Sequence, residues 1–261
     1  MQKEWPFDGL RGVVRMWSDP ALAAGALERW MAGRPPGSVA MLSRVDSRPG
    51  SGEPTEPDPT PPSPRDRIVR FWVEGGERWR VELGTGGADG TVVSDHGQWL
   101  HWTGSTAVSG ESPSHQPPPG LPGEVHAMLD PDELLSEVEV TPTGRVVIAG
   151  RDASGLTATP RDPDHILWPG AQELGLALDD QIRILLRLEL LFEGKAFHRL
   201  EFVELELDPE LPDDLFRLDL PPGVPVLRTP PPGELGRGRR PPRPEGWPRV
   251  GWRGIHLRWK K

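Results

Sequence analysis

The sequence contains no cysteine, no tyrosine and no asparagine among its 261 residues. Without cysteine, the chain can form no disulfide bond, no thiolate nucleophile and no cysteine-ligated zinc site. We attribute the missing tyrosine and asparagine, and the excess of arginine over lysine, to a GC-rich genome and not to a function. The 11 tryptophans are expected to fill aromatic positions that other proteins share with tyrosine.

Long hydrophobic runs are absent as well. No apolar stretch of this sequence approaches the roughly 18 residues of a membrane-spanning helix, so we expect a chain that does not span a bilayer. The first residues, Met1–Asp8, carry an acid and a proline where a secretion signal has apolar residues. This N-terminus predicts a cytoplasmic protein.

Recognisable catalytic and metal-binding motifs are missing. The seven histidines show no helical metal-binding spacing, and the sequence has neither a Gly-x-Ser-x-Gly elbow nor a phosphate-binding glycine loop. Two clusters, Arg161–His165 and Ser94–His96, set acids beside a histidine. The proline and the loop context of the first favour a solvated turn, and catalytic triads are assembled in space, not by adjacency. We expect no enzymatic activity, no metal site and no cofactor.

The charge is unevenly distributed along the chain. The net charge is −9, but residues 228–261, the basic tail, hold ten Lys/Arg and two Asp/Glu, a net of +8 that leaves −17 for the rest. Arginines among tryptophans can hold single-stranded nucleic acid, whereas the acidic body would repel phosphates. We therefore expect no nucleic-acid partner. Docking of the tail on the acidic body, or its solvation, stays open, as does a protein partner that binds the tail.

The most informative stretch is 178–220, which alternates apolar and polar residues with period two. This pattern predicts two strands of a half-buried sheet, Asp180–Phe192 and Ala196–Asp208, joined by a turn at Glu193-Gly194-Lys195. Ordinary strands have about 5–6 residues. Strands much longer than this must curve, so the pattern indicates a sheet that wraps around something.

The remainder of the chain predicts short helices and strands that are separated by turn residues. Ser18 or Asp19 can cap a helix that ends near Gly33. Short strands between glycine-rich turns are typical of an antiparallel meander. The expected strands are 38–45, 67–74, 78–83, 91–94, 98–102, 138–141, 145–150 and 155–159, with a second helix at 130–136 and proline-rich loops at 48–65 and 103–123.

Four stretches of this pattern resemble one known family. They are Arg70–Glu74 with Arg78–Glu82, Val93–Trp102, Gly155–Pro160 before the hairpin, and Leu211–Phe216 with Pro221–Gly223. Together they resemble the bacterial lipoprotein carriers (LolA-like) and their relative, the sensor domain of RseB-type sigma-factor regulators. The resemblance implies an α+β fold, mostly antiparallel β, in which a curved half-open barrel is covered by helices and encloses an apolar cavity for acyl chains.

The resemblance also divides the chain. It implies an N-terminal extension at 1–18, a half-barrel domain at 19–227 with the proline-rich loop 48–65 inserted, and the basic tail at 228–261. Members of the family are usually exported, whereas the N-terminus of this chain predicts the cytoplasm.

Two functions follow as hypotheses. The first is non-enzymatic binding of a hydrophobic small molecule or lipid, because each CH₂ moved from water to an apolar cavity gains about 0.8 kcal/mol. The alternative is an RseB-like protein-interaction or regulatory module whose core is filled by its own side chains. For each candidate lining residue the alternative is ordinary core packing. The candidates are Phe71, Trp79, Val81, Leu100, Trp102, Ile184, Leu186, Leu188 and Phe202.

Overall fold

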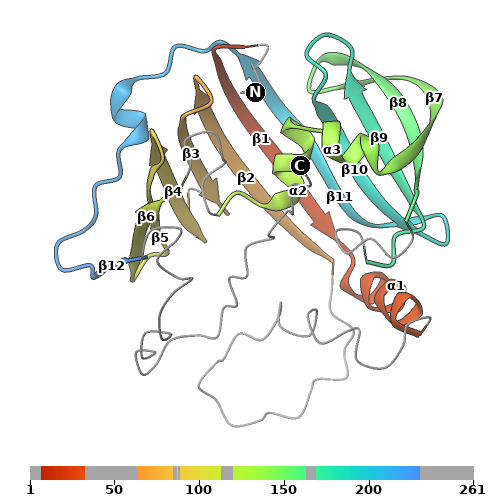
Figure 1. Ribbon diagram of the computed structural model, residues 1–261, viewed down its shortest axis with the longest axis horizontal. Coiled ribbons are helices and arrows are strands. Elements are labelled where there is room, and N and C mark those ends of the chain that lie inside the picture. Colours follow the sequence, from red (N-terminus) through yellow and green to blue (C-terminus); the bar gives the residue numbers. More distant parts are fainter. Residues whose placement is uncertain are drawn as a thin grey trace, which may run out of the picture.

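Strands make up most of the computed structural model, which describes residues 7–32, 64–84, 87, 89–112, 120–162 and 169–229 (Figure 1). The strands are β1 (Gly9–Ser18), β2 (Arg65–Glu74), β3 (Arg78–Leu83), β4 (Gly90–Asp95), β5 (Gln98–Trp102), β6 (Ala107–Glu111), β7 (Val138–Ile148), β8 (Arg151–Pro160), β9 (Glu173–Asp179), β10 (Leu185–Phe192), β11 (Lys195–Leu207) and β12 (Val226–Arg228). The helices are α1 (Pro20–Ala32), α2 (Gly123–Leu129), α3 (Asp132–Ser136) and the 3-10 helix η2 (Asp213–Phe216).

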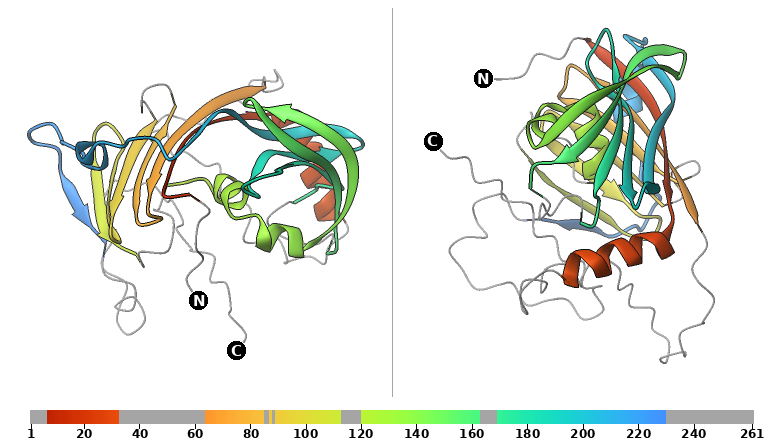
Figure 2. Two further views of the ribbon diagram at one scale, coloured as in Figure 1. Left: turned by 90° about the horizontal axis from the view of Figure 1, so that it is seen from above. Right: turned by 90° about the vertical axis from the view of Figure 1, so that its right-hand side faces the viewer.

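The strands form one twelve-stranded sheet in the order β12-β6-β5-β4-β3-β2-β1-β11-β10-β9-β8-β7. Every pair is antiparallel except β12 with β6. Seen from above, the sheet is an arch, with α2 and α3 on its concave side beneath β7–β10 (Figure 2). This open, curved, mostly antiparallel sheet with few helices confirms the predicted fold class.

The core lies on the concave face, where two aromatic rings meet over the central strand. Phe71 of β2 and Phe202 of β11 pack edge to face with ring centroids 5.9 Å apart. Gly12 of β1 lies between these strands, and a Cβ built there would be 2.5 Å from Phe71 Cζ and 2.9 Å from Phe202 Cε1. The missing side chain at Gly12 is therefore what lets the two rings touch across β1.

The convex face of β3 and β4 is covered by the segment that contains η2, which runs along the outside of the arch (Figure 2). The guanidinium of Arg78 lies 4.4 Å from the ring centroid of buried Phe216 and pairs with Asp213. Arg80 donates to the backbone carbonyl of Leu215 at 3.0 Å. The cations of β3 thus fasten the closing segment to the outer face of the sheet.

The predicted strand Asp180–Phe192 is wrong in its first five residues. Strand β9 ends at Asp179 and β10 begins only at Leu185, with Arg183 in the left-handed region at φ 57°. The buried Asp179 carboxylate accepts the backbone N–H groups of Gln181 and Ile182 at 2.8 and 2.9 Å. These hydrogen bonds hold a tight turn, so the long strand of the hairpin is β11, with 13 residues.

The N-terminal segment is also more than an extension. The sequence places the start of the half-barrel at residue 19, whereas β1 (Gly9–Ser18) lies in the middle of the sheet and pairs with β2 and β11. The predicted loop 103–123 likewise contains β6. The expected strand 38–45, nearly all of the 48–65 insertion and the basic tail beyond Thr229 lie outside the described residues.

Of the two edge strands of the sheet, β12 is short and β7 is irregular. Strand β12 has three residues. Strand β7 has eleven residues, but its pairing with β8 shifts register between Pro142 and Gly144. The proline lacks an N–H group, so the row of backbone donors along β7 is interrupted.

Two glycine-to-alanine variants test the packing over β1. Gly12→Ala forces a methyl group into the contact of Phe71 with Phe202 and should lower the free energy of unfolding by about 1–3 kcal/mol. Gly25→Ala, in α1 with no atom within 4 Å of its Cβ position, should raise it by about 0.5–1 kcal/mol through helix propensity. Urea denaturation measures both, and equal effects of the two variants would contradict the proposed packing.

Candidate functional site

Seven of the nine predicted lining residues lie in a packed core. Each is at most 2% exposed, and together they join one cluster that also includes Val125, Met128 and Leu129 of α2. None of the seven lines the cavity next to α1 or the hollow on the convex face. The seven are Phe71, Trp79, Val81, Ile184, Leu186, Leu188 and Phe202.

The other two predicted residues lie on the opposite face of the sheet. Leu100 pairs with Val93, which in turn pairs with Arg80, the arginine that holds the closing segment. Trp102 pairs with Thr91 on the same convex side. Directly paired residues of an antiparallel sheet share a face, so Leu100 and Trp102 are not brought together with the other seven.

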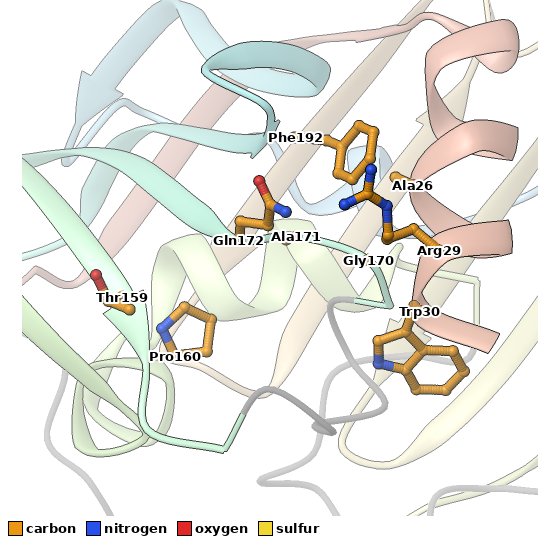
Figure 3. Close-up of a pocket in the computed structure, with 9 residues that line it drawn as sticks. All are labelled: Ala26, Arg29, Trp30, Thr159, Pro160, Gly170, Ala171, Gln172 and Phe192. Atoms are coloured by element: carbon orange, nitrogen blue, oxygen red, sulfur yellow. The ribbon is translucent and has the colours of Figure 1, made fainter. Parts of the chain in front are cut away.

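An apolar cavity of about 180 Å³ lies between α1 and the ends of β8 and β10 (Figure 3). Its innermost residues are Ala26, Ala171 and Phe192, which are all buried. The full lining is Ala26, Arg29, Trp30, Thr159, Pro160, Gly170, Ala171, Gln172 and Phe192. We call it the α1 cavity and treat it as the candidate binding site.

Small residues at one crossing point shape the α1 cavity. Gly170 has φ 85°, and a Cβ added to it would lie 2.5 Å from the backbone carbon and oxygen of Ala26. The chain before β9 can therefore come close to α1 only because residue 170 has no side chain. Neither Gly170 nor Ala26 carries a chemical group that would mark a site in the sequence, so sequence reasoning missed this cavity.

Helix α1 is fixed firmly at its first turn and packs lightly beyond it. The Asp19 carboxylate accepts the backbone N–H groups of Ala21 and Leu22, each at 3.0 Å, which confirms the predicted cap. The backbone N–H of Asp19 also donates to the carbonyl of Phe197 at 2.9 Å. Ala26 is the one residue of α1 that is fully buried, so the helix has an anchor at one end and a small contact area along its length.

The rim of the α1 cavity is polar and carries a single cation. The Arg29 guanidinium lies 5.9 Å from the ring centroid of Phe192, and its Nη2 is 3.3 Å from Glu193 Oε1. Figure 3 shows the side chains of Arg29 and Phe192 next to each other. The Gln172 side-chain oxygen accepts the backbone N–H of Glu193 at 3.0 Å.

A second, larger hollow of about 490 Å³ lies on the convex face where β1, β11 and the β10–β11 turn meet. Its two arginines are already neutralised: Arg15 forms a bidentate pair with Asp66 at 2.9 and 3.0 Å, and Arg199 pairs with Glu189. This hollow is lined by four charged side chains together with Trp17 and Ala196. Its lining is Arg15, Trp17, Lys195, Ala196, Arg199 and Glu201.

Within the described parts of the chain, no group of three or more histidine, aspartate or glutamate side chains could hold a metal ion. The described helices include none that is both long and apolar enough to cross a membrane.

His198 of β11 is a titratable group in an apolar setting. Its Nε2 atom is buried and has no hydrogen-bond partner among the described residues. Burial lowers the pKa of His198, opposed by the nearby Glu124 carboxylate of α2 and by a hydrogen bond that the ring donates to the Trp17 backbone. The folded protein therefore favours the neutral form of the His198 ring.

Comparison with known proteins gives similarity of fold. No family model matches the sequence, and no curated protein matches it. The chain is similar to an uncharacterised conserved protein from Thermus thermophilus, at 14% identity and a TM-score of 0.43, over 86% of this chain and 92% of that one. It is also similar to a chain of the MucA/MucB complex of Pseudomonas aeruginosa, at 19% identity and a TM-score of 0.44, over 81% of this chain and 56% of that one.

A LolA superfamily protein from Nitrosomonas europaea is similar at 11% identity and a TM-score of 0.33, over 82% of this chain and 92% of that one. These likenesses concern the fold and not the function. The open, curved antiparallel sheet with helices on its concave side agrees with the curved half-open barrel that the sequence resemblance implies.

The lowered pKa of His198 predicts a loss of stability in mild acid. The unfolded chain binds a proton near pH 6.5, whereas the folded protein binds it only at lower pH. Stability from this group is thus fully present above pH ~6.5 and is lost as the pH falls towards the folded pKa.

His198→Gln cannot take up that proton. The free energy of unfolding of the variant, measured by urea denaturation from pH 7.5 to 5.5, should fall less than that of the unmodified protein. His101, whose pKa is also lowered by burial, contributes equally to both curves. Parallel curves would show that His198 does not titrate at a lowered pKa.

Proposed function

We propose that this protein is a non-enzymatic binding protein that holds the apolar part of a small molecule or lipid, such as an acyl chain, in the α1 cavity. The observation that supports this most is the open apolar pocket lined by Ala26, Trp30, Pro160, Ala171 and Phe192 where helix α1 meets the sheet. Small-molecule sites are typically concave and apolar, with a few polar groups that fix orientation. Arg29 and Gln172 are such groups at this rim.

The cavity volume limits how much ligand fits. An apolar protein cavity of about 150 Å³ accommodates a benzene molecule, so the α1 cavity, at about 180 Å³, takes roughly seven carbon atoms. At about 0.8 kcal/mol per CH₂, these contribute about 5–6 kcal/mol before the costs of association. Binding in this geometry is then weak, on the order of millimolar.

Outward movement of α1 would give room for a longer chain. The helix is held at Asp19 and buries only Ala26 completely, so its displacement breaks few apolar contacts. Behind the cavity lies the core that contains Leu186, Leu188 and the other predicted lining residues. We propose that these residues meet the ligand only in such an opened form.

The alternative function is a protein-interaction or regulatory module. It is favoured by the seven predicted lining residues that fill the core with the protein's own side chains. In that case the outer surfaces, and not an interior cavity, would bind the partner.

Two measurements on the full chain distinguish the functions. Native mass spectrometry of the purified protein should show a co-purifying long-chain lipid held in the opened form, and a ligand-observed NMR titration should detect the weak binding of 1-octanol. A clean unliganded mass, no octanol binding and recovery of a protein partner would reject the binder and support the module.

A plugging variant tests the location of the site. Thr159 is exposed and lines the α1 cavity, so Thr159→Phe should fill it from the rim and weaken 1-octanol binding by about tenfold or more, the loss of roughly 1.4 kcal/mol. Thr141→Phe is the matched control, because Thr141 is exposed on β7 and lies outside the cavity lining. Equal octanol affinities of the two variants in the NMR titration would place the site elsewhere.

A further inference from the structure

We propose that the α1 cavity takes a single-chain carboxylate of medium length, whose anionic head binds Arg29 while its hydrocarbon tail fills the apolar interior. This inference rests on the proposed function and names its ligand class.

The place of Arg29 follows from helix geometry. Ala26, Arg29 and Trp30 are spaced i, i+3 and i+4, so they share one face of α1, and all three line the cavity. Ala26 is buried at the interior end, whereas the Arg29 side chain is 67% exposed. A molecule that enters tail first along this face leaves its head beside the guanidinium.

Arg29 is the cation of the cavity lining, and Glu193, which pairs with it at the rim, is not a lining residue. Of the nine lining residues, Arg29 is the one with an ionisable side chain. The Gln172 carbonyl oxygen is occupied by the Glu193 backbone N–H, which leaves the amide NH₂ of Gln172 as a second donor at the rim. One cation and one amide donor favour an anionic head over a neutral or cationic one, and the fork of a guanidinium matches a carboxylate in a bidentate manner.

The present partner of Arg29 is weakly held. The contact of Arg29 Nη2 with Glu193 Oε1 is 3.3 Å long, longer than the usual 2.7–2.9 Å of a charge-assisted hydrogen bond. Both side chains are more than half exposed, at 67% and 58%, and exposed ion pairs contribute little. A ligand carboxylate can therefore replace Glu193 while the guanidinium stays over the ring of Phe192.

The cavity volume argues for one chain. Space for roughly seven carbons, by comparison with a benzene-sized cavity, fits the tail of octanoate and excludes two or three acyl chains side by side. A medium-chain carboxylate matches both parts of the cavity: its apolar tail fits the interior, and its head carries one negative charge for Arg29.

The test compares sodium octanoate with 1-octanol, which has the same chain and an uncharged head, in NMR titrations of the full chain. The unmodified protein should bind octanoate about tenfold more tightly than octanol, as expected for a charge-assisted bidentate contact. Arg29→Gln should bring this preference close to one. Glu193→Gln should increase it severalfold, because the competing carboxylate is gone.

Arg11→Gln is the matched control. Arg11 is an exposed arginine that pairs with Glu206 on the convex face and does not line the cavity, so its variant should keep the full preference. Equal binding of octanoate and octanol to the unmodified protein, or an unchanged preference in Arg29→Gln, would overturn the inference and leave the proposed function standing. Failure of both ligands to bind would reject the proposed function itself.

Discussion

The hydrogen bonding of strand β1 on both of its edges is the constraint on which the rest of the structure depends. β1 pairs with β2 on one side and with β11 on the other, so it joins the two legs of the arch. The Asp208 carboxylate, just past the end of β11, accepts the backbone N–H groups of Asp8 and Gly9 and fixes the start of β1. Because α1 follows β1 directly, the position of the candidate site is also set by this strand.

Core and cavity place opposite demands on side-chain size. Over β1 the absence of a side chain at Gly12 lets Phe71 and Phe202 touch, and the two rings occupy the place of the missing side chain. Next to α1 the absence of one at Gly170 lets two backbones approach, and the surrounding side chains leave a cavity. A glycine at a close contact therefore supports core packing at one place and leaves room for a ligand at another.

The sequence predicts the fold class well because period-two alternation and turn residues are local signals. Strands β3 and β5 have the predicted bounds, and the Asp19 cap is present. Strand β1 is not predictable in this way, because Gly12 reads as a turn residue although its role is to make space for rings from other strands. The turn after Asp179 is hidden for a similar reason: Ile182 and Ile184 continue the alternation, while the buried carboxylate and its partner Arg151 decide the backbone path.

The candidate site was even less visible in the sequence. Large apolar residues mark a core and a ligand cavity alike, so Phe71, Leu188 and Phe202 were reasonable candidates, and the structure places them in a packed interior. The α1 cavity instead depends on Ala26, Gly170 and Ala171, whose importance comes from the contact between segments that lie far apart in the sequence.

The interrupted edge strand β7 has a consequence for behaviour at high concentration. A free strand with a regular row of amides is a template on which a second molecule can add its own strand, and repeated addition leads to fibres. On one edge of the sheet Pro142 and the register shift beside it make β7 irregular, and on the other edge β12 has only three residues. Both edge strands of the twelve-stranded sheet therefore present a poor template for the strand of a second molecule.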